Sequence, residues 1–139
     1  MKAKDIMTTE LITVHPDLSI RQLIKLMLEK SISGVPVVDE FNNLVGIISE
    51  KDIIKAVERL IKIKVSLDEQ KEWQGGFNWV EGIMTKKVIT VDEEDPVEKV
   101  CQVMSEHRIH RVPVMRGNKI VGIISTMNIL KMIANSAKE

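Results

Sequence analysis

Val45-Gly46-Ile47-Ile48-Ser49-Glu50-Lys51-Asp52 is the stretch that decides the fold, because it returns as Val121-Gly122-Ile123-Ile124-Ser125-Thr126-Met127-Asn128. In both copies, β-branched residues after a glycine predict a short buried strand. The serine that ends this strand is followed three residues later by Asp52 or Asn128, a pattern typical of a helix N-terminus. The recurrence therefore indicates two repeats in which a strand leads directly into a helix.

The pattern Ser49-x-x-Asp52 has two interpretations. A helix N-terminus offers unpaired N–H groups and a partial positive charge, which favour a phosphate or a hydroxyl-rich group. A carboxylate held there can accept hydrogen bonds from two neighbouring sugar hydroxyls, as an acidic residue does in dinucleotide-binding folds. The same pattern resembles a capping box, which in most proteins only stabilises the start of a helix. The repeated stretch alone leaves both interpretations open.

Further matches extend the repeat upstream of this stretch. They predict an extended Ile-Thr-Val triplet, an amphipathic helix with one buried face, and a turn that leads into a proline-containing strand. We expect Pro36 and Pro113 at the first residue of their strands or at a sheet edge, because proline cannot donate to a sheet ladder. Asp95 before Pro96 fits an N-cap and a first helical residue. The matching segments are 6–8 with 83–85, 12–14 with 89–91, 20–28 with 97–104, and 32–38 with 109–115.

The repeats divide the chain into a first repeat at residues 1–62, a linker at 63–80 and a second repeat at 81–139. A single repeat this short would bury too little surface to be comfortably stable, so we expect two halves that share a core. The linker either pins itself to the body through its aromatic side chains or forms a lid or a partner-binding surface. It holds three of the four aromatic residues of the chain: Trp73, Phe77 and Trp79.

Composition argues against several classes of function. Lys+Arg and Asp+Glu number 20 each, so no net field attracts nucleic acid or an anionic membrane. No apolar run approaches the roughly 20 residues that cross a bilayer, and the N-terminus lacks the apolar core of a signal peptide. A single cysteine, Cys101, excludes an internal disulfide and favours a cytoplasmic protein. Neither the histidine spacing nor any nucleophile or phosphate-loop motif indicates a metal site or a catalytic residue.

Taken in order, these motifs resemble the cystathionine-β-synthase (CBS) domain. The order is Ile-Met-Thr, Ile-Thr-Val, amphipathic helix, Ser-Gly-Val-Pro-Val-Val and Val-Gly-Ile-Ile-Ser-x-x-Asp. A second copy, with His-Arg-Val-Pro-Val and Val-Gly-Ile-Ile-Ser-x-x-Asn, makes the chain similar to a tandem CBS pair, or Bateman module. The resemblance covers nearly everything except the insert at 62–81 and the termini. It implies an α+β fold of two β-α-β-β-α repeats packed about a pseudo-twofold axis.

The resemblance also implies a function. Paired CBS repeats bind adenosine-containing ligands such as AMP, ADP, ATP or S-adenosylmethionine in the cleft between the repeats, and they act as regulatory modules rather than enzymes. The implied partners are this small adenosyl ligand, a second copy of the chain in a homodimer, and a regulated protein that the sequence does not identify. No required cofactor is implied. The alternative is a constitutive dimerisation scaffold whose clefts stay empty.

The same resemblance assigns roles to individual residues. Asp52 would hold ribose hydroxyls, while Ser49 and Ser125 would contact ribose or phosphate. Asn128 departs from the pattern, because an amide loses the charge-assisted hydrogen bonds that a carboxylate makes to a diol. We therefore expect the Asp52 site to bind a nucleotide better than the Asn128 site, which would be weak or empty.

A basic pair, His110 and Arg111, stands out in the second copy, where the first copy has the neutral Ser33 and Gly34. An arginine can grip phosphate oxygens in a fork, and a histidine titrates near neutral pH. The hypothesis is that this pair reaches towards a phosphate whose ribose Asp52 holds. A solvated or carboxylate-paired arginine is the alternative. The remaining predicted ligand contacts are Thr13, Val14, Ser33, Gly34, Val35, Pro36, Ile47, Thr90, Val112 and Pro113.

Overall fold

The computed structural model describes residues 1–62 and 78–136 of the chain. Two of the three linker aromatics, Trp73 and Phe77, lie outside the described residues, whereas Trp79 is exposed. Within the described residues, no helix has the length and apolar character required to span a membrane.

The chain forms two compact units that do not follow the order of the sequence. Unit 1 combines Met1–Leu11 with Ile89–Glu139, and unit 2 is Ile12–Val88. The opening segment of each repeat thus belongs to the unit built around the other repeat. The buried side chains also group in two clusters, one in each unit.

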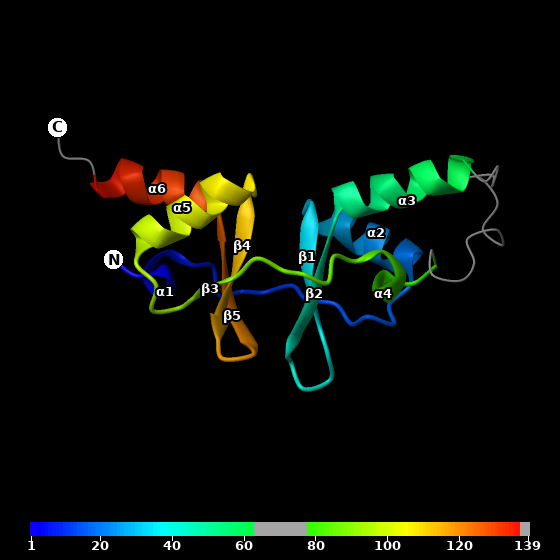
Figure 1. Ribbon diagram of the computed structural model, residues 1–139, viewed down its shortest axis with the longest axis horizontal. Helices are drawn as coiled ribbons and strands as arrows, with labels where there is room; N and C mark the ends of the chain where they lie inside the picture. Colours follow the sequence, from blue (N-terminus) through cyan, green and yellow to red (C-terminus); the bar gives the residue numbers. More distant parts are fainter. Residues whose placement is uncertain (63–77, 137–139) are drawn as a thin grey trace. The chain divides into compact units, whose positions relative to one another are not determined.

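Unit 2 is built on an antiparallel hairpin with its helices on one side (Figure 1). The predicted first strand of this repeat is reduced to a single parallel bridge between Val14 and Val37. A turn joins the two strands, and the Asp39 carboxylate accepts from the backbone N–H groups of Phe41 and Asn43. The elements are α2 (Ile20–Lys30), β1 (Gly34–Val38), β2 (Leu44–Ser49), α3 (Glu50–Lys62) and α4 (Val80–Ile83).

The helix α2 begins and packs as an amphipathic pattern predicts, with one exception. Ser19 is its N-cap, and its hydroxyl accepts from the N–H of Gln22 at 3.1 Å. Ile20, Leu23 and Met27 are buried, but Leu28 is 75% exposed and does not belong to the buried face. From α4, the fully buried Val80 joins the same core. Residues 78–88 therefore complete unit 2.

Unit 1 has a sheet in the order β3-β4-β5, with β3 parallel and β5 antiparallel to β4. Pro113 lies within the central strand β4, and not at its start or at an edge as expected. The sheet tolerates it there because the pairing with β3 begins only at Val114. The elements are α1 (Ala3–Ile6), β3 (Val91–Asp92), α5 (Val97–His107), β4 (Arg111–Arg116), β5 (Lys119–Ser125) and α6 (Thr126–Ser136).

The start of α5 corrects another expectation. Pro96, with an extended backbone, is the N-cap, so the helix begins one residue later than predicted. Asp95 does not cap α5. Its carboxylate accepts from the N–H of Asp92 at 2.9 Å and pairs with Lys99 at 3.3 Å. The acidic side chain therefore closes the turn before the helix.

Ion pairs link residues 1–11 to the rest of unit 1. Lys2 and Lys4 donate to the two carboxylate oxygens of Glu94 at 2.6 and 2.7 Å. These hydrogen bonds lower the pKa of Glu94 to about 2. Ala3 is fully buried, and its N–H donates to the carbonyl oxygen of Asp95 at 2.7 Å. The segment thus packs as an integral part of the unit.

The opening segment that each unit takes from the other repeat is called the exchanged segment. One glycine in each unit makes room for a methionine of this segment. A Cβ at Gly46 would lie 2.7 Å from the sulfur of Met84, and a Cβ at Gly122 would overlap the side chain of Met7. Real Cβ atoms essentially never come this close to other heavy atoms. Both methionines therefore act as packing residues.

Candidate functional site

The candidate site in unit 2 lies where β2 ends and α3 begins. Ser49 is the last residue of β2, and Glu50 is the first of α3. The Oδ2 atom of Asp52 accepts from the backbone N–H of Ser49 at 2.8 Å and from its hydroxyl at 3.2 Å. The half of the capping-box pattern in which the carboxylate accepts from the Ser49 N–H is therefore present. A cap does not exclude a ligand, because these two bonds use only one carboxylate oxygen.

The other oxygen of Asp52 holds the exchanged segment. Thr85 donates from its Oγ1 atom to Oδ1 of Asp52 at 2.9 Å. The backbone of Thr85 exchanges two hydrogen bonds with Ile47, at 2.8 and 2.9 Å. The half-buried carboxylate of Asp52 thus connects the start of α3 to a segment that lies beyond the end of α3 in the sequence. No signal in the sequence pairs Asp52 with Thr85.

The second copy has the same arrangement with different chemistry. The Oδ1 atom of Asn128 accepts from the N–H and hydroxyl of Ser125 at 2.8 and 2.7 Å. Its Nδ2 atom donates to the carbonyl oxygen of Ile6 at 2.9 Å and to Oγ1 of Thr8 at 3.2 Å. A carboxylate has no hydrogen for the Ile6 carbonyl, so this neighbourhood accounts for an amide at position 128.

Around the α3 start, the structure brings several further predicted residues of unit 2 together. The Ser33 carbonyl accepts from the N–H of Glu50 at 2.9 Å, which places the start of β1 beside the start of α3. The side chains of Val14 and Val35 belong to the buried core. The remaining residues are Thr13, Gly34 and Ile47, which are half-buried, and Pro36, which is buried.

The predicted residues of unit 1 gather at the start of α6. The His110 carbonyl accepts from the N–H and the hydroxyl of Thr126 at 2.9 and 3.2 Å, while Arg111 pairs with Ser125 in the sheet register. The His110 side chain is exposed, and that of Arg111 is half-buried. The others are Thr90, exposed before β3, and the buried Val112 and Pro113. Their binding roles stay predictions.

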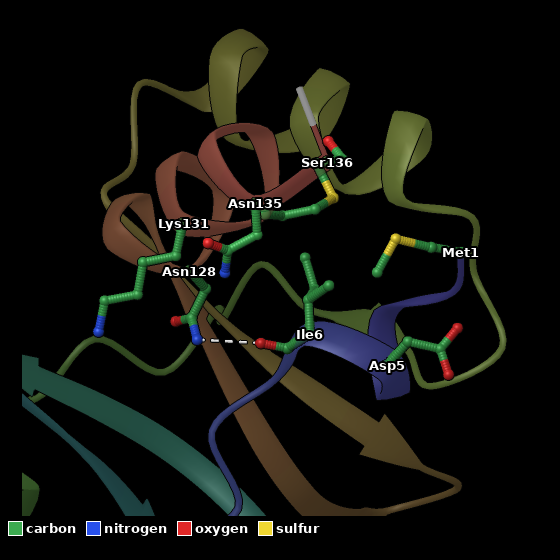
Figure 2. Close-up of a pocket in the computed structure, with 8 residues that line it drawn as sticks. Met1, Asp5, Ile6, Asn128, Lys131, Asn135 and Ser136 are labelled. Carbon is green, nitrogen blue, oxygen red and sulfur yellow. Dashed lines mark hydrogen bonds between the residues drawn. The ribbon is translucent and has the colours of Figure 1, made fainter. Parts of the chain in front are cut away.

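A pocket of about 370 Å³ lies within unit 1, between α1 and α6 (Figure 2). Its volume is in the range of small-molecule sites. Asn128 is the one predicted site residue among the described residues that line it, and its amide donates to Ile6 at the pocket wall (Figure 2). The lining residues of α6 follow Asn128 at helical spacing, so the sequence could have indicated this part of the pocket wall. The other lining residues are Met1, Asp5, Lys131, Met132, Asn135 and Ser136.

The match to a family model defines the class of this protein. The CBS domain model matches twice, at residues 3–59 and 80–135. The chain therefore belongs to the CBS domain family and contains two copies of the domain. This confirms the resemblance, and the mixture of helices and strands agrees with the fold that it implied.

Solved structures of similar proteins cover nearly the whole chain. The CBS domain pair of protein MJ0100, in complex with 5′-methylthioadenosine and S-adenosyl-L-methionine, is 33% identical with a TM-score of 0.78, over 99% of this chain and 98% of that one. The structure of CBSX2 in complex with AMP is 26% identical with a TM-score of 0.81, over 96% of both chains.

Curated relatives are longer proteins. L-aspartate semialdehyde sulfurtransferase of Methanocaldococcus jannaschii is 35% identical over 93% of this chain. The match covers only 22% of that enzyme, and the chain spans no more than 42% of the two curated relatives that follow it in similarity. The activities of these whole proteins thus say little about the matched segment itself.

Proposed function

We propose that the chain is a regulatory module that senses an adenosine-containing ligand, such as AMP, ADP, ATP or S-adenosylmethionine, and signals its presence to a partner protein. The observation that carries the proposal is the similarity, over nearly the full chain, to two CBS pairs whose structures contain adenosine compounds. The ligands of those two proteins share an adenosyl group, so this group is the recognition element that we propose for the present chain.

Asp52 is the proposed ribose-binding residue. It is half-buried at the N-terminus of α3, where backbone N–H groups favour a carboxylate or a phosphate. A carboxylate accepts strong, charge-assisted hydrogen bonds from a diol. Asn128 lacks this charge, and both hydrogens of its amide are already used on Ile6 and Thr8. We therefore propose one strong ligand site per chain.

Homodimerisation belongs to the same proposal. The helix α6 has no buried residue among its described positions. Met127, Leu130 and Ile133 are 57%, 52% and 53% exposed and recur every three residues along it. On α3, Ile54 and Ile61 are exposed at a spacing of two helical turns. Such apolar stripes are typical of helices that pack against another copy.

The same stripes favour one alternative, a constitutive dimerisation scaffold that binds no ligand. The two functions differ in a thermal-shift screen of the full chain against AMP, ADP, ATP, S-adenosylmethionine and 5′-methylthioadenosine. A ligand that binds only the folded state raises the melting temperature in proportion to the logarithm of its concentration above Kd. The sensor requires a concentration-dependent shift with at least one of them, and the scaffold predicts none.

A further inference from the structure

The Thr85 hydroxyl occupies one acceptor position on the Asp52 carboxylate. Among the described residues, Asp52 receives three hydrogen bonds: two from Ser49 on Oδ2 and one from Thr85 on Oδ1. An ionised carboxylate has about four lone-pair positions. One position on Oδ1 thus remains, whereas the two hydroxyls of a ribose need two.

We propose that Thr85 is a positioning residue that sets how firmly Asp52 holds a ribose, because its hydroxyl occupies the acceptor that the second ribose hydroxyl requires. The inference rests on the proposed function, in which Asp52 accepts from the ribose. It adds the residue that limits this interaction.

Thr85 can release Asp52 more easily than the backbone N–H of Ser49 can. One of the Ser49 donors is a backbone N–H at the end of β2, and losing it would remove the cap of α3. Thr85 donates from an exposed side chain, while its backbone stays fixed by two hydrogen bonds to Ile47. A rotation about χ1 therefore frees Oδ1 without moving the backbone.

The second repeat supplies an internal control. Thr8 occupies the position equivalent to Thr85, but its hydroxyl accepts from the amide of Asn128. A residue that accepts from an amide does not compete with a diol for a carboxylate. Thr8 should therefore have no influence on ribose binding, although its packing is comparable.

Adenosine and 2′-deoxyadenosine distinguish this role from a merely structural one. The deoxy compound has one ring hydroxyl fewer and needs only the acceptor that is already open. Removing the Thr85 hydroxyl should therefore strengthen the binding of adenosine and leave that of 2′-deoxyadenosine unchanged. A structural defect would weaken both.

The test is calorimetric titration of the full chain and its variants with both nucleosides. Thr85→Val should bind adenosine about tenfold more tightly, the equivalent of one hydrogen bond gained by the ribose, with 2′-deoxyadenosine within about twofold of the parent. Thr85→Ala should repeat this increase, which guards against a local defect caused by valine. Thr85→Ser keeps the hydroxyl and should therefore keep the parental ratio of the two affinities. Thr8→Val should keep this ratio as well.

Two outcomes would overturn the inference while the proposed function stands: an unchanged ratio of affinities in Thr85→Val and Thr85→Ala, or equal weakening of both nucleosides. If the parent chain bound neither nucleoside nor any adenosyl ligand, the proposed function would fail and the inference with it. Titration of the parent chain thus separates the two failures.

Discussion

The Nδ2 atom of Asn128 donates to the carbonyl oxygen of Ile6 at 2.9 Å, which links the start of α6 to the start of the chain. The equivalent Asp52 accepts from the hydroxyl of Thr85. At equivalent positions, Asn128 therefore donates to the exchanged segment, whereas Asp52 accepts from it. An amide and a carboxylate are not interchangeable at these two sites.

The substitution Asn128→Asp should destabilise the protein. It places a carboxylate against the Ile6 carbonyl, with loss of a hydrogen bond and repulsion between two acceptors. We expect a cost of about 1–3 kcal/mol in urea unfolding. The matched control is Asp52→Asn, which should cost less, because the Thr85 hydroxyl can accept as well as donate. Equal costs would contradict this account of position 128.

Gly122→Ala should also destabilise unit 1. The new Cβ would overlap the side chain of Met7, and such overpacking typically costs about 1–3 kcal/mol. Because the overlap involves one side chain, Met7→Ala in the same chain should recover part of the loss. A double-mutant cycle measures this coupling. Purely additive effects would show that the strain lies elsewhere.

The packing of residues 1–11 against unit 1 should weaken in acid, because it depends on the charge of Glu94. Its pKa falls from 4.5 to about 2 because Lys2 and Lys4 donate to it, so the carboxylate is stabilised in the folded state. Its contribution is complete above pH 4.5 and is lost as the pH falls towards 2.

Glu94→Gln should therefore be less stable than the parent at pH 7, and the difference should shrink to nothing near the bottom of that range. Unfolding curves at several pH values measure it. A difference that persisted unchanged in acid would mean that Glu94 acts through packing and not through its charge.

Leu130→Arg should convert a dimer into a monomer. The substitution puts a charge in the exposed apolar stripe of α6, where a second copy would have to desolvate it. Light scattering coupled to gel filtration gives the mass. Leu28→Arg on α2 is the control, since this side chain is 75% exposed and lies outside the stripe. If both variants kept the parental mass, the stripe would not be the interface.

Sequence periodicity predicted most of the elements but not their partners. The repeated Val-Gly-Ile-Ile-Ser stretch fixed the β2–α3 and β5–α6 connections, because the local pattern determines a strand that ends in a cap. It could not place Met7 against Gly122 or Lys2 against Glu94, since these contacts join distant segments whose local sequences carry no pairing signal. The four-residue helices α1 and α4 were not predicted, because so short a helix is too brief to show a helical period in the sequence.

For the candidate site, the sequence named candidate residues but not the contacts that each one makes. It proposed Asp52 as cap or ligand contact, and the structure shows that the cap uses only part of the carboxylate. The pocket beside Asn128 was not foreseen, because its lining comes from α1 and α6, which are far apart in sequence.

Calorimetric titration with the adenosyl ligands, on the parent chain and on Asp52→Asn, tests the central claim most directly. Asparagine keeps an acceptor for Ser49, so the fold should survive while the charge is lost. The account predicts about one ligand per chain and an affinity at least about tenfold weaker in Asp52→Asn, as expected for the loss of charge-assisted hydrogen bonds. Glu29→Gln, the same change at an exposed position of α2, should bind as the parent does. Unchanged affinity in Asp52→Asn would contradict the claim.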